Sequence, residues 1–427
     1  MREMKDSGIA WIGAMPRAWK MNTIAQIFLQ VKCKNTGLQE KNLLSLSYGK
    51  VKRKSIDTVE GLLPESFDGY NIIEKDDIVL RLTDLQNDHA SLRVGLAEER
   101  GIITSAYLTI RNRSNFCPKY LYYYLHSFDI AKGFYGMGAG VRQGLNWDGV
   151  KWLKILAPSV PEQERIAAFL DAECAEIDAV LEKTRASIEE YKKLKQAVIT
   201  QAVTKGVRGD RPMKDSGIEW IGEIPAGVPI SRVGLHFDIV LGKMLCSAPV
   251  DDNYTLESYY CAADVHFEGL SNGEKKKMWF SPDEKEQYCV KNGDLLVVEG
   301  GAGAGGCAIA VSTDVPIYIQ NSIMIVRSKG ISNIRYLRYL LECLVKKGYI
   351  DVVCNKATIP HFTKDKLANV PFIVFSQSEQ EEIAEYLNEK CAGIDALIVK
   401  KQQYLTEIEN YKKSLIYEYV TGKKEVV

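Results

Sequence analysis

Two stretches of the chain repeat with a spacing of seven residues. The first runs through Leu170, Ile177, Thr184, Tyr191 and Val198, and the second through Leu387, Ile394, Lys401, Ile408 and Leu415. A heptad pattern of this length is typical of a helix that packs along its length against another helix. We therefore expect long helices at 159–206 and 376–422, packed antiparallel. The residues expected in this packing are Leu170, Ile177, Leu181, Ile188, Tyr191, Leu387, Ile394, Ile408 and Leu415.

The ends of both helices carry capping residues. The capping-box pairs are Ser159 with Glu162 and Ser378 with Glu381, and the glycines that suit the far ends are Gly206 and Gly422. Each helix could span about 43 residues, or roughly 65 Å at 1.5 Å per residue. Thr204 is then expected beyond the main packed stretch, so we expect residues inserted after it to lengthen the spacing that the helices set.

The blocks that precede the two helices combine strand and helix patterns. Runs of β-branched or alternating apolar residues, bounded by Asp and Gly, predict strands, and a short aromatic helix follows in each block. The strands are expected at 78–82, 102–110, 295–299 and 317–326, and the short helices at 120–128 and 334–344. The expected fold class is therefore α/β, of the mixed α+β kind.

The chain also repeats itself. The segment MKDSGIAWIGAMP begins at Met4 and MKDSGIEWIGEIP begins at Met213, and ten of their thirteen positions match at an offset of 209. Further along, Glu162 corresponds to Glu379 at an offset of 217, and this offset holds to the end of the helical segments. The sequence therefore indicates a duplication, with eight extra residues early in the second copy.

This duplication divides the chain into four parts. We expect a first globular domain at 1–158, a central helical region at 159–212, a second globular domain at 213–375 and a C-terminal helical region at 376–427. The two globular domains would be similar, separated by the two long helices and related by a pseudo-twofold repeat. The alternative is one large domain with a decayed repeat.

Composition narrows the class of protein. Lys and Arg number 55 and Asp and Glu number 55, so the net charge is zero. No run of 18 apolar residues exists, which favours a cytoplasmic protein without a membrane span or secretion signal. The ten cysteines are scattered without a C-x-x-C pair, so we expect buried reduced thiols and no metal site.

Three motifs hint at catalysis, and each lacks a required part. Gly301, Gly303 and Gly306 form a G-x-G-x-x-G, but a dinucleotide site needs a helix next, and 307–311 reads as a strand. The segment 369–372 reads Asn-Val-Pro-Phe, without the first proline of the amino-methyltransferase motif, and no loop for a methyl donor is found. Asp283 with Glu299 resembles a metal nuclease without its lysine. We therefore expect a noncatalytic chain that carries no cofactor.

Basic residues cluster next to aromatic ones at two places, a combination that suits phosphate contacts, although a solvated charged turn is the commoner meaning. Residues 1–160 carry 22 basic and 16 acidic residues, whereas 213–375 carry 17 and 19, so charge alone does not indicate a nucleic-acid-binding protein. The first cluster, beside Tyr48 in a stretch that reads as a loop, and the second, before Trp279, comprise Lys50, Lys52, Arg53, Lys54, Lys275, Lys276 and Lys277.

The sequence resembles the specificity subunits of type I restriction-modification systems. The resemblance is carried by the opening MKDSGI at Met4 and Met213, by the helix start PEQERIAAFLD at Pro161 with its twin SEQEEIAEYLN at Ser378, and by Glu-Ile-Asp-Ala from Glu176. These segments span both repeats, nearly the whole chain.

The resemblance implies that each globular domain is a target recognition domain for one half of a bipartite, asymmetric site in double-stranded DNA. The long helices would set the spacing and dock two methyltransferase (modification) subunits, and restriction (translocase/endonuclease) subunits would complete the complex. S-adenosylmethionine, ATP and Mg would then belong to the partner subunits. The family thus implies a subunit that has no enzymatic activity by itself.

Base contacts are expected from polar side chains in loops of the two domains. Our candidates are Arg142 and Gln143 in the first domain, with Thr358 and His361 around the corresponding positions of the second. Two other functions remain open: a cytoplasmic coiled-coil adaptor that binds only proteins, and a dinucleotide-dependent enzyme that uses the glycine motif.

Overall fold

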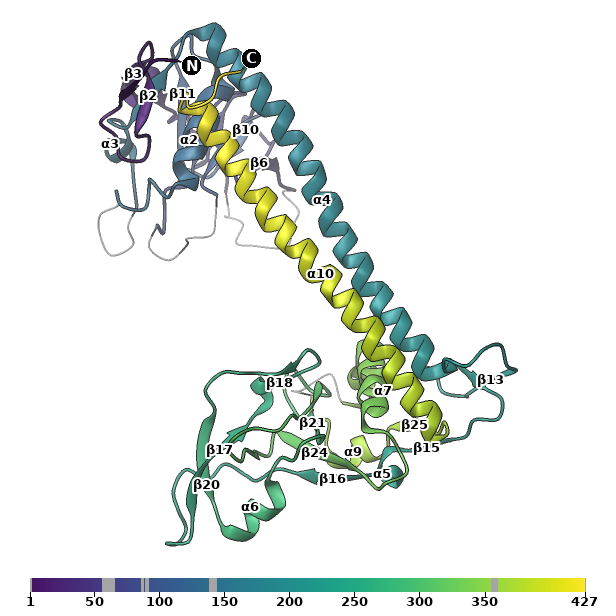
Figure 1. Ribbon diagram of the computed structural model, residues 1–427. Coiled ribbons are helices and arrows are strands. Elements are labelled where there is room, and N and C mark those ends of the chain that lie inside the picture. The colour runs from purple at the N-terminus through teal and green to yellow at the C-terminus, as the bar shows by residue number, and fades with distance from the viewer. Residues whose placement is uncertain are drawn as a thin grey trace. The chain divides into compact units, whose positions relative to one another are not determined.

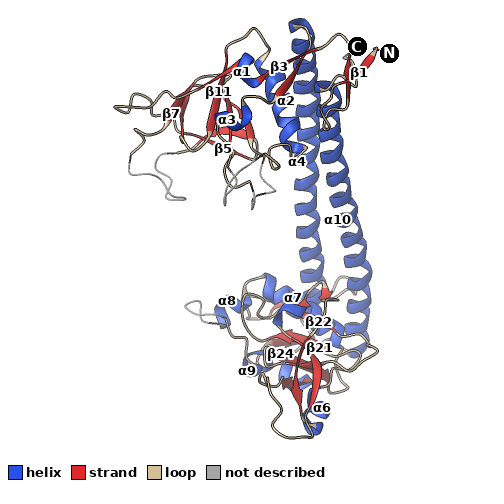
Figure 2. Cartoon of the chain, turned by 90° about the vertical axis from the view of Figure 1, so that its left-hand side faces the viewer, coloured by secondary structure: helices blue, strands red, loops and turns tan. Residues whose placement is uncertain are grey.

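The computed structural model describes residues 2–55, 66–85, 88, 92–137, 144–354 and 360–426. The chain divides into two compact units, residues 1–185 with 402–427 and residues 186–401. Both helical segments expected from the sequence are thus shared between the units. Each unit combines a sheet with helices, which confirms the mixed fold class. In the first unit β5, β7 and β11 lie to one side of the long helices, whereas β1 lies on the other side (Figure 2).

The first unit begins with a small hairpin, and a four-stranded sheet lies at its centre (Figure 1). Its strands are β1 Met4–Asp6, β2 Ala14–Pro16, β3 Lys20–Thr23, β4 Phe28–Gln30, β5 Leu44–Ser47, β6 Lys50–Arg53, β7 Asn71–Ile73, β8 Ile78–Leu80, β9 Val94–Leu96, β10 Gly101–Ile103, β11 Leu108–Asn112 and β12 Lys154–Ala157. Its shorter helices are α1 Ile24–Ile27, α2 Pro118–Ile130 and α3 Trp147–Val150.

The second unit follows the same plan with a longer middle part. Its strands are β13 Met213–Asp215, β14 Glu223–Pro225, β15 Ile230–Arg232, β16 Phe237–Leu241, β17 Thr255–Tyr260, β18 Val265–His266, β19 Gly269–Leu270, β20 Lys276–Phe280, β21 Leu295–Val298, β22 Cys307–Ile309, β23 Tyr318–Ile319, β24 Ile323–Ser328 and β25 Pro371–Ile373. Its shorter helices are α5 Val233–His236, the 3-10 turn η1 Ala262–Asp264, α6 Pro282–Tyr288, α7 Ile334–Lys346, α8 Tyr349–Val353 and α9 Lys364–Ala368.

The central sheets of the two units have the same strand order. The first is β4-β11-β8-β9 and the second is β16-β24-β21-β22, all antiparallel, and β3 pairs with β12 as β15 pairs with β25. β4 and β16 begin 209 residues apart, whereas β8 and β21 begin 217 apart. The duplication is therefore confirmed, and the extra residues lie before β21, as the sequence indicates.

The same ion pair fixes the centre of both sheets. Arg111 donates from Nε and Nη2 to the two carboxylate oxygens of Asp77, both at 2.7 Å. Arg327 makes the same fork with Asp294 at 2.8 and 2.7 Å. In both pairs the carboxylate is nearly buried, and planar two-point pairs of this kind are strong because donor and acceptor geometries match.

Two expected strands are each divided in the structure. The stretch 102–110 forms β10 and β11, separated by a turn in which Tyr107 N–H donates to Thr104. The stretch 317–326 forms β23 and β24, separated by a turn in which Ile323 N–H donates to Gln320. The apolar runs were read as single strands because the short polar turns inside them contain neither Gly nor Pro.

The long helices begin and end close to the predicted positions. They are α4 Val160–Lys205 and α10 Gln377–Val420, and the glycines that follow them adopt left-handed φ values of 77° at Gly206 and 72° at Gly422. This is the usual glycine termination of a helix. The capping pair expected at Ser378 is wrong, because the side chain of Ser376 accepts the N–H of Glu379 instead.

Within each unit the two long helices run antiparallel. In the first unit Lys412 pairs with Asp178 at 2.6 Å and Arg185 pairs with Glu409 at 2.6 Å. In the second unit Lys195 pairs with Asp395 at 2.7 Å. The heptad residues that are buried in these packed segments are Leu170, Ile177, Leu181, Ile188, Leu387, Ile394 and Leu415, and those that are half-buried are Tyr191 and Ile408.

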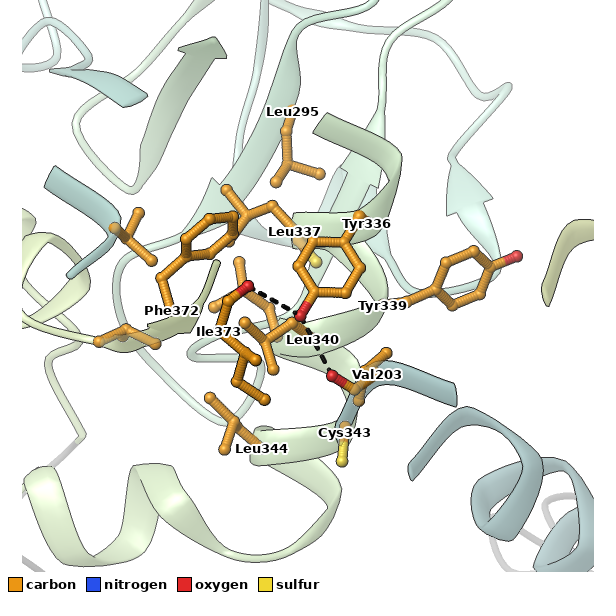
Figure 3. Packing of buried hydrophobic residues seen from close by; sticks show 14 of the residues in the cluster. Val203, Leu295, Tyr336, Leu337, Tyr339, Leu340, Cys343, Leu344, Phe372 and Ile373 are labelled. Atoms are coloured by element: carbon orange, nitrogen blue, oxygen red, sulfur yellow. Dashed lines mark hydrogen bonds between the residues drawn. The ribbon is translucent and has the colours of Figure 1, made fainter. Parts of the chain in front are cut away.

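The end of α4 lies inside the core of the second unit. The phenol of Tyr336, on α7, is fully buried and donates to the carbonyls of Val203 at 3.1 Å and of Ile373 at 3.2 Å (Figure 3). Val203 and Thr204 are themselves buried. The expectation that Thr204 lies beyond the packed stretch is therefore wrong, because the second unit packs against the last turn of α4.

Candidate nucleic-acid interface

Each unit joins the end of a central strand to the segment that precedes a short helix. In the first unit Leu145 N–H donates to Leu82 O at 2.9 Å, and in the second Phe362 N–H donates to Glu299 O at 2.6 Å. These bonds occupy equivalent places, 217 residues apart. We call the loops that meet here the first reading edge (48–49, 81–85, 92–93 and 144–146) and the second reading edge (299–306 and 360–363).

A buried arginine holds the first reading edge. The guanidinium of Arg93 is fully buried and donates from Nη1 to Arg81 O at 3.0 Å and Thr83 O at 2.8 Å. Its backbone N–H donates to the Asp129 carboxylate at 2.6 Å. Burial is the main cause that raises the pKa of Asp129 from 3.8 to about 6. Because its guanidinium bonds two successive parts of one loop, Arg93 fixes the loop's backbone rather than facing a ligand.

The tip of the β5–β6 hairpin adds an exposed aromatic ring to this edge. Tyr48 has φ of 47° and Gly49 has φ of 75°, the conformation of a type I′ turn. A Cβ atom on Gly49 would lie 3.1 Å from Leu92 Cβ, so the tip lies against the end of the loop after β8. Tyr48 is 85% exposed although this conformation is unfavourable for a bulky residue. The tip thus presents a strained aromatic ring to solvent beside the loop after β8.

The second reading edge is built on a glycine turn between β21 and β22. Gly301 and Gly305 have φ of 88° and 80°. A Cβ atom on Gly305 would lie 2.8 Å from Ile350 and 2.9 Å from Val345, so the turn packs closely on α7 and α8. The residues after it form the strand β22 and not a helix. The interpretation of this motif as a strand connection is therefore confirmed, and the dinucleotide hypothesis lacks its helix.

Glu299 and His361 form a polar pair on the second reading edge. The Nδ1 atom of His361 lies 3.3 Å from Oε2 of Glu299. The backbone of His361 is held on several sides, since its carbonyl accepts from Lys366 Nζ at 2.7 Å and from Cys354 Sγ at 3.1 Å. The side chain of His361 is nevertheless 60% exposed, and that of Glu299 is 18% exposed. The edge thus presents a fixed acidic and imidazole pair to solvent.

The first basic cluster lies on a strand, so its reading as a loop is wrong. Lys50, Lys52 and Arg53 belong to β6, which pairs with β5. Arg53 is exposed and forks onto Glu99, whose pKa this hydrogen bond lowers. Lys50 Nζ lies 3.8 Å from Asp178. Lys50 and Lys52 are exposed and Lys54 is half-buried.

The second basic cluster is divided by the structure. Lys275 donates to Asp264 at 3.0 Å and to Ser271 O at 2.7 Å, and only 10% of its side chain is exposed. Its ammonium is therefore used inside the domain and is not presented to a ligand. Lys276 and Lys277 are exposed on β20.

The loop candidates are only partly described. Arg142, Gln143 and Thr358 lie outside the described residues, and His361 is the one of the four that the structure places. Sequence reasoning did not identify Arg93 as the residue that fixes the first edge. The only signal in the sequence was that Arg93 is a charged residue within an otherwise apolar strand region. No other local signal marks it, because its partners lie on separate segments.

The remaining motifs form ordinary structure. Pro371 and Phe372 belong to β25, which leads into α10, as expected. Asp283 lies on α6, whereas Glu299 bonds His361 on another element. Among the described residues, no group of three or more His, Cys, Asp or Glu side chains is arranged to hold a metal ion. Over the same residues, no helix is long and apolar enough to cross a membrane.

Comparison with known proteins gives the class of this architecture. Residues 268–407, about a third of the chain, match the family model described as type I restriction modification DNA specificity domain. No curated protein matches the chain in sequence. This stretch, which begins within the second unit and ends in α10, is thus similar to a domain of that description.

Solved structures share the fold over nearly the whole chain. One, from work on complex assembly and conformational transition of the type I R-M system, has a TM-score of 0.71 at 17% identity and covers 95% of this chain and 98% of its own. The HsdS subunit from Thermoanaerobacter tengcongensis has a TM-score of 0.52 at 16% identity, with coverage of 96% and 98%. The fold expected from the resemblance to type I specificity subunits is therefore confirmed.

Proposed function

We propose that this chain is the DNA-reading subunit of a type I restriction-modification complex, and that its two globular domains each contact one half of a bipartite site in double-stranded DNA. The observation that carries the proposal is the pair of reading edges, which share one scaffold and differ in chemistry. Leu82 and Gly144 in the first edge stand where Glu299 and His361 stand in the second. Two domains with the same scaffold but different side chains at their edges suit a DNA site whose two halves differ in sequence.

The shared scaffold and the different edges correspond to two kinds of contact with DNA. Residues that contact phosphates orient a protein on DNA, whereas contacts to base edges select the sequence. Lys50, Lys52, Lys276 and Lys277 are exposed and supply charge near strand ends without sequence information. The side chains that differ between the two edges would then determine which bases are preferred.

The long helices would dock two methyltransferase subunits, and restriction subunits would complete the complex. Exposed apolar side chains along α10 support docking, since Leu397, Val399, Tyr404 and Tyr411 are each more than two-fifths exposed. Aromatic and aliphatic side chains of this kind are enriched in protein interfaces. Adenine methylation with S-adenosylmethionine, and cleavage driven by ATP with Mg, would belong to these partners.

An adaptor that binds only proteins is the second candidate function. The exposed apolar residues of α10 suit it equally well, but it does not account for two edges of different polarity on one scaffold, and it does not account for the match to a DNA specificity domain. We therefore place DNA reading first.

The experiment that tests the proposal compares methylated sites in cells with and without this gene. We expect one asymmetric bipartite motif to lose methylation when the gene is deleted, and to regain it when the gene is restored. The purified chain should bind duplex DNA in a salt-sensitive way and should transfer no methyl group in the proven absence of its partners. Unchanged methylation after deletion, together with no binding of duplex DNA, would overturn the proposal.

A further inference from the structure

The pair formed by Glu299 and His361 is unusual for a surface that meets DNA. A carboxylate is repelled by phosphates, so Glu299 cannot contribute to affinity through charge. It can contribute to selectivity, because Glu accepts a hydrogen bond from the exocyclic amino group of cytosine in the major groove. From this chemistry and the exposure of the pair, we infer that Glu299 reads a cytosine in the half-site of the second domain and that His361 positions its carboxylate.

The geometry leaves one carboxylate oxygen for this task. Oε2 of Glu299 lies 3.3 Å from His361 Nδ1, whereas among the described residues Oε1 accepts no hydrogen bond. A ring that donates from Nδ1 holds the carboxylate in one orientation. The imidazole is therefore a positioning residue, and the carboxylate is the base-contacting group.

The surrounding backbone makes the pair rigid before any ligand binds. Phe362 N–H donates to Glu299 O at 2.6 Å and Gly301 N–H donates to Pro360 O at 3.1 Å, so two backbone bonds tie the segments that carry the two side chains. A Cβ atom on Gly300 would lie 3.1 Å from His361 Nδ1, so the strand end and the ring are in close contact. Groups held in position lose little entropy on binding, which favours selective contacts.

The first domain cannot make the same contact. The equivalent of Glu299 is Leu82, which is buried, and the equivalent of His361 is Gly144, which has no side chain. The inference therefore concerns one half-site only. It rests on the proposed function, because a base-reading role requires that the second domain bind DNA.

The test uses the full-length chain purified with its co-expressed methyltransferase subunits and a library of duplex DNA with randomised positions. We expect the wild-type complex to require cytosine at one position, and Glu299→Gln to change that preference to adenine, since Gln pairs with adenine N6 and N7. The change in preference between the two bases should be about 5- to 150-fold, and all other positions should keep theirs.

The positioning role of His361 has its own readout. His361→Asn keeps a donor near the place of Nδ1 and should retain the cytosine preference, whereas His361→Ala should relax it at the same position. Glu286→Gln removes an exposed glutamate on α6 and is the matched control, which should leave every preference unchanged. Thermal unfolding midpoints establish that each variant is folded. If Glu299→Gln is not folded, the effect of His361→Ala on the cytosine preference decides the question.

The outcomes separate the inference from the function on which it rests. A Glu299→Gln complex that keeps the wild-type base preference, or that loses affinity equally for all sequences, would show that the pair only stabilises its loop. A change in both halves of the site would also overturn the inference. A wild-type complex that selects no sequence at all would instead contradict the proposed function.

Discussion

The phenol of Tyr120, in the first domain, donates to the carbonyl of Val420, which lies 3.3 Å away at the end of α10. The same hydroxyl lies 3.0 Å from the carbonyl of Leu156 on β12. Tyr120 is fully buried, and burial raises its pKa well above the ordinary value, so the group stays a neutral donor. The last turn of α10 is therefore part of the core of the first unit, as the end of α4 is in the second.

Loss of this hydroxyl should destabilise the first unit. In Tyr120→Phe the two buried carbonyls lose their donor, which should cost about 1 to 2 kcal/mol of unfolding free energy. Urea unfolding of the full chain measures it. Tyr411→Phe removes a hydroxyl from a half-exposed ring on α10 and should leave the unfolding curve unchanged. Equal stability of the wild type and Tyr120→Phe would show that the hydrogen bonds of this hydroxyl make no net contribution to the unfolding free energy.

Tyr48 is expected to lower the stability of the first unit and to increase its affinity for DNA. Tyr48→Asn places an Asn-Gly pair at a type I′ turn, where Asn tolerates positive φ, so the unfolding free energy should rise by up to about 1 kcal/mol. Because the exposed ring is lost, affinity for the cognate duplex should fall by about fivefold. Fluorescence anisotropy with labelled duplex DNA, beside thermal unfolding, measures both effects.

Two variants control this prediction. Tyr48→Phe keeps the ring and should keep the affinity. Leu38→Asn relieves another exposed residue with positive φ, at 52°, and should stabilise the first unit without affecting DNA binding. If Tyr48→Asn bound DNA as tightly as the wild type, the strained tyrosine would have no role in recognition.

Asp129 should make the first unit less stable as the pH rises. Its pKa is raised from 3.8 to about 6 in the folded chain, mainly by burial, so the protonated form is favoured by folding. Its stabilising contribution is complete below pH 3.8 and is lost as the pH rises through about 6.

The variant that tests this linkage is Asp129→Asn, which keeps an acceptor for Arg93 N–H and cannot ionise. We expect it to be about 1 to 3 kcal/mol more stable than the wild type at pH 7.5, with the difference vanishing near pH 4. Unfolding midpoints measured at half-unit steps between pH 4 and 7.5 check the prediction. A variant that is less stable than the wild type at every pH would show that the charged carboxylate is needed by Arg93.

The parts of the fold that the sequence predicted are those set by local patterns. Heptad spacing and terminal glycines gave both long helices within a residue or two, because helix periodicity and helix termination depend on neighbouring residues. The hairpin that carries Lys50 was taken for a loop, because its turn is Tyr48-Gly49 and lacks the usual Asn-Gly signal.

The candidate site could be predicted only in part, because its contacts join residues that are far apart in the sequence. Glu299 and His361 are 62 residues apart, and Arg93 bonds carbonyls and a carboxylate on several segments, so no local pattern marks these contacts. His361 was found through the repeat, which places it next to the counterparts of Arg142 and Gln143 in the second copy. Glu299 was noticed as a possible metal ligand, and only the backbone pairing of Gly300 with His361 shows its partner.

The last prediction concerns spacing and rests on the proposed function. α4 and α10 each run through both units, which divide between Arg185 and Ala186 in α4 and between Lys401 and Gln402 in α10. Four residues inserted at both boundaries lengthen each helix by about 6 Å and rotate it by only about 40° beyond a full turn. We expect both half-sites to stay unchanged and the preferred spacer to grow by about two base pairs at 3.4 Å each. The same insertion after Thr204 falls inside the second unit, next to the bond from Tyr336 to Val203, and should not change the spacer. Methylome sequencing distinguishes the two, and an active complex with boundary insertions and an unchanged spacer would show that the helices do not set the distance.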